Sequence, residues 1–369
     1  MKKCVSSLIL CSILALTSAC SSGNKQDQTN AKYTNKKSKI TVYMPKGQYI
    51  DNKYFNNNDI AINYLPPVKG DFEQKEIDKI ANSIDKNVKV LIISSKNKGL
   101  ISVFDKVKKK LPGIITIAAD MQESREDDSR NLRKDTNIEV AMNIDENRKA
   151  RNIATLSSQM GANTFAYIYN KDSNDPEQYL DLSEAREYCN QSSIKFVEVP
   201  MSINDVKSGK IHEVTDKLVK ENGKEIAVYT SEVKLTGDIL KDSLKLGYIV
   251  PNINSDQDSL ILAKELGLEK EMHSLKRKDF DEKVSSVLEK KNMKGRIAGL
   301  SESRQGITTE IAIETALYMY DKSFALEECY EDSSIRDRAN QELGLLVEPQ
   351  YSGSAYGYVR SIYLSPRIY

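Results

Sequence analysis

Ten short apolar runs constrain the fold of this 369-residue chain more than any other feature. Several consist of Ile, Val, Leu and Ala with little polar alternation, as in 88–94, which is typical of parallel strands covered on both faces. The segments between them, such as 99–111, repeat apolar residues at spacings of three and four and predict amphipathic helices. The predicted strands are 40–44, 60–65, 88–94, 113–119, 138–144, 164–169, 195–199, 226–230, 248–253 and 296–301.

The alternation of strand and helix predicts an α/β fold with right-handed crossovers and parallel sheets. Ten strands are many for one sheet, and the long helix predicted at 146–162 begins a second series of strands and helices. We therefore expect two hinged, Rossmann-like lobes with a ligand cleft between them. The expected N-terminal lobe comprises 39–143 plus about 293–325, with strand 296–301 returning to it, and the expected C-terminal lobe comprises 144–292.

The expected hinge consists of segments in which the chain passes between the lobes, near Asn143, near 256–264 and near 291–296. The last part of the chain, 326–369, is expected to form a charged, exposed helix and a Tyr-rich tail. The tail either offers a strand to a partner or packs back on a lobe or across the hinge, and we favour packing. The alternating residues of that packing are Tyr356, Tyr358 and Ile362.

The first residues have the pattern of a secretory signal, with a positive start, an apolar run at 5–16 and small residues before Cys20. The apolar run is shorter than the roughly 20 residues of a membrane-spanning helix. The sequence LTSAC, which ends at Cys20, resembles a bacterial lipobox and implies a signal peptide at 1–19 and acylation of Cys20. The alternative is a soluble secreted protein in which Cys20 stays free. Polar residues at 20–38 predict a flexible tether, so we expect a lipid-anchored, extracytoplasmic protein.

Composition and motifs argue against nucleic acid as a partner and against catalysis. The formal net charge is +1, and the charged residues are interspersed rather than grouped. His212 and His273 lie in polar helical stretches without metal-ligand spacing, and no nucleophile elbow or phosphate-binding loop occurs. Cys189 lies on a predicted helix, and we expect its thiol to face the protein core rather than to act as a nucleophile. Whether it pairs with Cys329 is left open. We therefore expect no enzyme activity, no metal and no cofactor.

Residues 160–200 carry a family resemblance. They contain a helix that ends at Gly161, the strand 164–169, a polar loop, a helix with Arg186 and the strand 195–199. This order resembles the opening of the second lobe of type I periplasmic binding proteins and of lactose-repressor effector domains, and is most similar to uncharacterised bacterial surface lipoproteins with that fold. The resemblance implies a two-lobed receptor that closes on a small molecule. Repressors carry a helix-turn-helix before the effector domain, where this chain has a lipobox and a tether, so a regulator role is disfavoured.

Polar residues at the carboxyl ends of the predicted strands are the candidate ligand contacts, because ligands of open α/β sheets bind at that edge. Lys96 and Arg304 would hold an anionic group, although Arg304 could instead brace its loop. Asn252 lies at such a strand end as well. The candidates are Lys46, Gln48, Ser94, Ser95, Lys96, Asp120, Tyr169, Asn170, Ser231, Glu232, Asn254, Glu302 and Arg304.

Taken together, these features predict a membrane-anchored solute receptor of an ABC importer that works by hinge closure. The expected partners are a small-molecule ligand, the membrane through Cys20, and a permease. The alternative is a ligand-sensing lipoprotein that does not transport and that pairs with a signalling protein. The absence of Trp disfavours a sugar slightly, since sugar receptors stack rings on aromatic faces.

Overall fold

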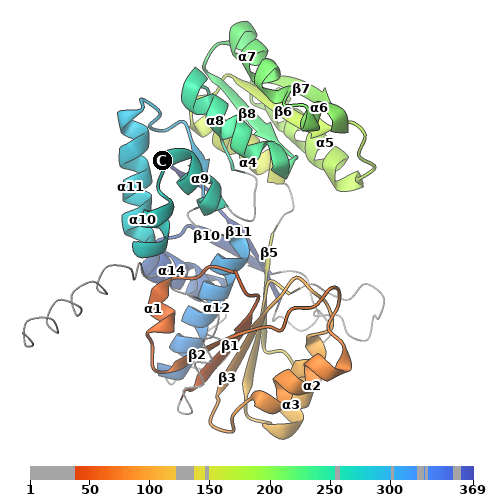
Figure 1. Ribbon diagram of the computed structural model, residues 1–369, viewed down its shortest axis with the longest axis vertical. Helices are drawn as coiled ribbons and strands as arrows, with labels where there is room; N and C mark the ends of the chain where they lie inside the picture. Colours follow the sequence, from red (N-terminus) through yellow and green to blue (C-terminus); the bar gives the residue numbers. More distant parts are fainter. Residues whose placement is uncertain are drawn as a thin grey trace, which may run out of the picture. The chain divides into compact units, whose positions relative to one another are not determined.

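The computed structural model describes most of the chain from residue 38 onward, and all of these residues belong to one unit, 34–369 (Figure 1). The described residues are 38–121, 137–145, 149–253, 258–300, 303–321, 328, 331–351 and 359–369. Several predicted features lie outside them. These are the signal peptide 1–19, Cys20, the tether apart from Ser38, Asn254, Glu302, Cys329, Tyr356 and Tyr358.

A seven-stranded sheet, called the first sheet below, is built from continuous apolar runs. Its strands are β1 Ile40–Met44, β2 Ile60–Tyr64, β3 Val90–Ser94, β4 Ile115–Ala119, β5 Val140–Ile144, β10 Val347–Tyr351 and β11 Val359–Leu364. Their order is β10-β11-β5-β4-β3-β1-β2, and every neighbouring pair is parallel except β10 with β11. The predicted parallel α/β architecture is therefore confirmed.

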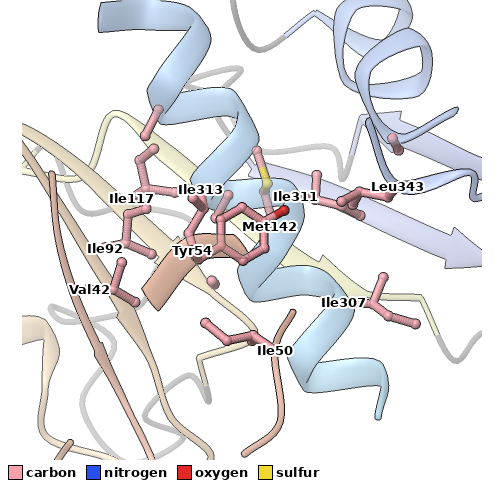
Figure 2. Packing of buried hydrophobic residues seen from close by; sticks show 14 of the residues in the cluster. Val42, Ile50, Tyr54, Ile92, Ile117, Met142, Ile307, Ile311, Ile313 and Leu343 are labelled. Atoms are coloured by element: carbon pink, nitrogen blue, oxygen red, sulfur yellow. The ribbon is translucent and has the colours of Figure 1, made fainter. Parts of the chain in front are cut away.

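Helices cover both faces of the first sheet. Because successive residues of a strand point to opposite faces, each strand contributes side chains to two buried clusters. Tyr43 and Leu91 belong to a buried cluster with α2 Gln74–Ser83 and α3 Ile101–Lys110. Val42 and Ile92 belong to the opposite cluster, with α1 Asn52–Phe55, α12 Arg304–Asp321 and α14 Asp332–Leu343. Figure 2 shows this second cluster, in which side chains of the strands lie beside Tyr54 and α12.

A second sheet contains three parallel strands, β6 Thr164–Asn170, β7 Lys195–Met201 and β8 Ile226–Thr230, in the order β7-β6-β8. Isolated parallel bridges continue this ladder from Ala227 to Ile249 and from Val250 to Ile297. Beyond them, β9 Ala298–Gly299 pairs antiparallel with β12 Arg367–Ile368.

The second sheet is also covered on both faces. Its Phe165 and Tyr167 pack in a cluster with α4 Lys149–Gln159 and α5 Pro176–Gln191. Its Ala166 and Val228 pack in another cluster with helices that follow β7. Those helices are α6 Ile203–Lys207, α7 Ile211–Asn222, α8 Thr236–Leu246, α9 Asp258–Leu266, α10 Glu269–Ser274 and α11 Arg277–Lys290, with the 3-10 turn η2 Val233–Leu235 before α8.

The end of the chain adds a strand to the first sheet and pairs with β9 next to the second sheet. Strand β11 joins the first sheet beside β5 with Ile362 fully buried, and β12 joins the second ladder beside β9. The last residue, Tyr369, is 3% exposed, and its backbone N–H donates to the Ile297 carbonyl at 3.0 Å. The preferred prediction, in which the tail packs onto the protein, is confirmed for Ile362.

Three details differ from the sequence-based expectations. Ile297, within the predicted strand 296–301, bridges to Val250 in the second ladder, and the chain joins the first sheet's cluster only afterwards, at Leu300 and α12. The described residues show no crossing near 256–264, because Ile253 before it and Leu268 after it share one buried cluster. The charged helix α14 is not wholly exposed, since its apolar residues pack in the first sheet's cluster.

Among the residues that the structure describes, no helix is long and apolar enough to cross a membrane.

Candidate functional site

The carboxyl ends of β1 and β3 are tied to α12 by the side chain of Gln48. Its Nε2 donates to Thr309 Oγ1 at 2.7 Å and to the Gln305 carbonyl at 3.2 Å, and its Oε1 accepts from Ser94 Oγ at 3.3 Å. The structure thus brings together the predicted ligand residues Gln48 and Ser94. They are hydrogen-bonded to each other, and Gln48 is also hydrogen-bonded to α12, so they stabilise this edge of the first sheet.

The remaining candidates of the first sheet lie in turns. Ser95 is buried, and its Oγ donates to the Asn97 carbonyl at 3.2 Å and accepts from the Asn97 N–H at 3.0 Å. Lys46 and Lys96 are exposed. Asp120 directly follows β4 and has a φ of 51°, a left-handed conformation that Asp tolerates better than most residues.

At the second sheet, the buried Gln178 of α5 joins the ends of β6 and β8. Its Nε2 donates to the Asn170 carbonyl at 2.9 Å, and its Oε1 accepts from Ser231 Oγ at 3.2 Å. Gln178, which the sequence did not point to, therefore links the predicted residues Asn170 and Ser231 by hydrogen bonds. Tyr169 lies half-buried beside them, and burial raises the pKa of its phenol. The backbone N–H of Glu232 donates to Thr230 Oγ1 at 3.0 Å.

A cavity lies among the segments that connect the two sheets, and we call it the Asn252 pocket. It is bordered by the end of β5, the start of α4, the residues after Val250, the start of α12 and the end of β11. Of the candidates discussed from the sequence, Asn252 and Arg304 line it. The lining residues are Ile144, Asp145, Lys149, Ile153, Asn252, Arg304, Tyr363, Leu364 and Pro366.

Asn252 is the most informative residue of this pocket. Its side chain is 4% exposed, and neither its Nδ2 nor its Oδ1 has a hydrogen-bond partner among the described residues. Leaving a buried amide unpaired costs about 1–3 kcal/mol. Gln178, which is 8% exposed, has both amide atoms paired. Water or another molecule can supply the hydrogen bonds that such a buried amide lacks.

Charged side chains line the same cavity as Asn252. Among the described lining residues, Lys149 and Arg304 bring two positive charges and Asp145 brings one negative charge, a formal sum of +1. Arg304 is also the first residue of α12, where the helix dipole adds a partial positive charge. The segment that carries Asp145 is fixed to β11, because its backbone N–H donates to the Ile362 carbonyl at 2.9 Å. The pocket is consequently suited to an anionic or zwitterionic group.

The pocket is small in the described conformation. Its enclosed space is about 20 Å³, whereas the hollow counted out to open solvent is about 330 Å³. One water needs about 10–15 Å³ of such enclosed space, and small-ligand pockets begin near about 300 Å³. A ligand larger than water therefore needs the walls, which belong to different elements, to move apart.

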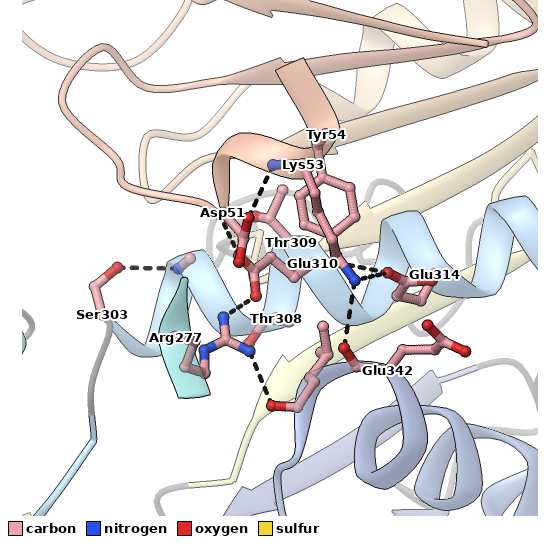
Figure 3. Close-up of polar contacts among 12 residues, drawn as sticks. Asp51, Lys53, Tyr54, Arg277, Ser303, Thr308, Thr309, Glu310, Glu314 and Glu342 are labelled. Atoms are coloured by element: carbon pink, nitrogen blue, oxygen red, sulfur yellow. Dashed lines mark hydrogen bonds and ion pairs between the residues drawn. The ribbon is translucent and has the colours of Figure 1, made fainter. Parts of the chain in front are cut away.

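A buried ion pair joins α11 to α12 (Figure 3). Arg277 of α11 pairs with Glu310 of α12, and their side chains are 6% and 0% exposed. Glu310 Oε1 also accepts from the Asp51 N–H at 2.6 Å. The neighbouring Glu314 accepts from Tyr54 Oη at 2.8 Å, and burial with these carboxylates raises the pKa of the Tyr54 phenol. Because α11 packs in the second sheet's cluster and α12 in the first sheet's, this pair holds the two together.

Reactive groups outside the pocket have structural surroundings. Cys189 is fully buried, as predicted, and burial raises the pKa of its thiol to about 11. His212 Nδ1 lies 2.8 Å from Asp242 Oδ1, and that carboxylate also accepts from Thr215 Oγ1 at 2.7 Å. Over the described ranges, no group of three or more His, Cys, Asp or Glu side chains is placed to hold a metal ion.

Comparison with known proteins gives this chain a family. A family model described as "Protein of unknown function (DUF3798)" matches residues 48–298, which is more than half of the chain. The chain belongs to the DUF3798 family. No curated protein matches it. The matched region includes Asp145, Lys149 and Asn252, whereas Arg304 and Tyr363 lie beyond it.

One solved structure shares the fold of this DUF3798 protein over most of its length. A candidate transcriptional regulator from Clostridium difficile 630 is similar with a TM-score of 0.72 and 23% identity, over 89% of this chain and 98% of that one. This match shows a shared fold.

Two transport proteins are less similar. A sugar ABC transporter protein from Actinomyces odontolyticus ATCC 17982 has a TM-score of 0.38 and 11% identity, over 62% of this chain and 74% of that one. An ABC transporter solute binding protein from Clostridium phytofermentans with bound β-D-glucose has a TM-score of 0.33 and 13% identity, over 76% and 83%. At such scores they add nothing to the fold assignment.

Proposed function

We propose that this protein is a lipid-anchored, extracytoplasmic receptor for a small molecule, and that it delivers its solute to an ABC importer. The observation that carries the binding role is the Asn252 pocket, which is lined both by a buried amide without a partner among the described residues and by charged side chains. Its described lining includes Asp145 and Lys149 at the first connection between the sheets, Arg304 after the second and Pro366 in the third. A ligand there would contact residues beside each connection, so we expect binding to be coupled to movement of the sheets.

The anchoring part of the proposal is supported by the sequence LTSAC before the polar stretch that follows Cys20. Two or three acyl chains hold a protein stably on a membrane, whereas one chain does so only marginally. Growth with a labelled fatty acid tests this directly. We expect label on the wild-type chain and its recovery with membranes, and we expect neither for Cys20→Ser.

The transport part is tested by cross-linking the anchored protein in its own cells and identifying the attached chains. A permease with its ATPase supports the importer, and loss of solute uptake on deletion of the gene supports it further. A kinase or chemoreceptor instead supports a ligand-sensing lipoprotein. If Cys20→Ser loses the fatty-acid label but still cross-links to the same chains, the anchor is not needed for the protein to bind its partner.

The name of the Clostridium difficile relative raises a role in transcription. The similarity covers 98% of that chain, so the solved relative contains almost no segment outside the shared fold. The likeness therefore supplies no separate DNA-binding module to this chain. With a formal net charge of +1, the protein also has little electrostatic attraction for DNA.

A further inference from the structure

The chemistry around Asn252 narrows the class of ligand. A primary amide is both donor and acceptor, and in Asn252 both functions are buried in the same pocket. A ligand that satisfies them needs an acceptor and a donor on neighbouring atoms. A lone apolar molecule would leave both unsatisfied, and a lone carboxylate would satisfy only the Nδ2 side.

The charges add a second constraint. The lining carries Lys149 and Arg304 against Asp145, and the N-terminus of α12 reinforces the positive side. Charge-assisted hydrogen bonds from lysine and arginine to a carboxylate are about twice as strong as neutral ones.

The rest of the lining is aliphatic. Ile144, Ile153, Leu364 and Pro366 form the apolar walls, and Tyr363 is the one aromatic residue among the described lining. Ring-stacking on two aromatic faces, as in many sugar sites, is not available from this set. Because the enclosed space is about 20 Å³, any such ligand enters only when the walls move apart.

We infer that the Asn252 pocket binds a small aliphatic carboxylate with an amino or hydroxyl group on the adjacent carbon, that is, an α-amino or α-hydroxy acid. The carboxylate pairs with Lys149 and Arg304, the adjacent donor faces Asn252 Oδ1 and Asp145, and the aliphatic part meets Ile144 and Ile153. This inference rests on the proposed receptor function and names the ligand class of that same site.

The test uses residues 21–369, which contain every described residue, and a matched set of probes. L-Alanine, L-valine, L-lactate and L-2-hydroxyisovalerate have both required groups. Isovalerate lacks the adjacent polar group, L-valinol lacks the carboxylate, and D-glucose represents sugars. Thermal shift and calorimetric titration at pH 7 measure binding. We expect binding by members of the first set, and at least about tenfold weaker binding by isovalerate and L-valinol, because each leaves a buried group unpaired.

Two variants and one control assign the effect to the pocket. Asn252→Leu and Lys149→Met should each weaken binding by about tenfold or more, whereas Lys241→Met, an exposed lysine on α8, should leave it within about twofold. Asn252→Leu should not lower the melting temperature of the ligand-free protein, because it replaces an unpaired buried amide with an apolar group of similar size. This variant therefore separates lost binding from lost folding.

The outcomes distinguish this inference from the proposed function. Tight binding of D-glucose, or of isovalerate as strongly as L-2-hydroxyisovalerate, overturns the ligand class and leaves a receptor in place. Binding of L-valine that survives Asn252→Leu overturns the site. If no probe binds but native mass spectrometry finds another molecule that Asn252→Leu releases, the ligand class is wrong and the receptor function stands.

Discussion

The buried pair of Arg277 and Glu310 makes a sharp prediction about stability. In Arg277→Met the apolar part of the side chain is kept and the guanidinium is removed. Glu310, 0% exposed on its side chain, then stays buried with the Asp51 N–H but without its counter-charge. The hydrogen bond from Arg277 Nη1 to the Leu343 carbonyl, at 3.4 Å, is lost as well.

The expected magnitude follows from the burial of both partners. Breaking a buried pair by removing one partner costs about 3–5 kcal/mol of unfolding free energy, because an uncompensated charge remains. For a chain of this size each kcal/mol lowers the melting temperature by about 1–2 °C, so we expect a fall of about 5 °C. Urea unfolding followed by circular dichroism at pH 7 measures the free energy, and calorimetry measures the temperature.

Two further variants make the comparison specific. Lys294 pairs with Glu289 at 2.8 Å, but these side chains are 66% and 61% exposed, so Lys294→Met should cost less than about 1 kcal/mol. The double variant Arg277→Met with Glu310→Gln removes both charges and keeps an acceptor for Asp51. It should recover more than half of the loss. If Arg277→Met costs no more than Lys294→Met, the pair does not hold α11 and α12 together as described.

Three further predictions concern other parts of the chain. A Cβ on Gly306 would lie 2.3 Å from the Tyr49 carbonyl oxygen, so Gly306→Ala should lower the unfolding free energy by about 1–3 kcal/mol, whereas Gly237→Ala, with nothing within 4 Å, should not lower it. Because burial raises the pKa of the Cys189 thiol to about 11, iodoacetamide at pH 8 should label it only after denaturation, and labelling of the native protein at the denatured rate would contradict its burial. Hydrogen bonds from the Ser202 backbone and hydroxyl hold the pKa of Asp205 well below its usual range. Its stabilising contribution is present above the unfolded pKa, about 3.9, and lost as pH falls through the lower folded value, so NMR titration should show a higher midpoint in Ser202→Ala.

The sequence predicted the strands best where burial is two-sided. Residues 90–93 of β3 are apolar throughout and buried because helices cover both faces of the sheet, and such a run can be recognised without tertiary information. The run 248–253 gave only isolated bridges, since Pro251 lacks the N–H that a ladder requires. Strand β10 contains Glu348 and Pro349 and lies at the sheet edge, so its composition carried no strand pattern.

The candidate site was predictable only as a region. Polar residues do gather at the strand ends, but Gln48 and Ser94 are hydrogen-bonded to each other. In the second sheet, Gln178 forms hydrogen bonds to both Asn170 and Ser231. A sequence cannot show which polar side chain is already paired. Asn252 was noticed for its place after a strand, and its importance comes from burial without a partner, which only the packing reveals.

The most direct test of a small-molecule receptor is a native mass spectrum of residues 21–369, purified gently from cells, beside the same chain with Asn252→Leu. The account predicts one small molecule bound per wild-type chain, released on denaturation and absent from the variant. It is contradicted if both chains carry nothing, and if neither gains thermal stability from amino acids, hydroxy acids, sugars or nucleosides.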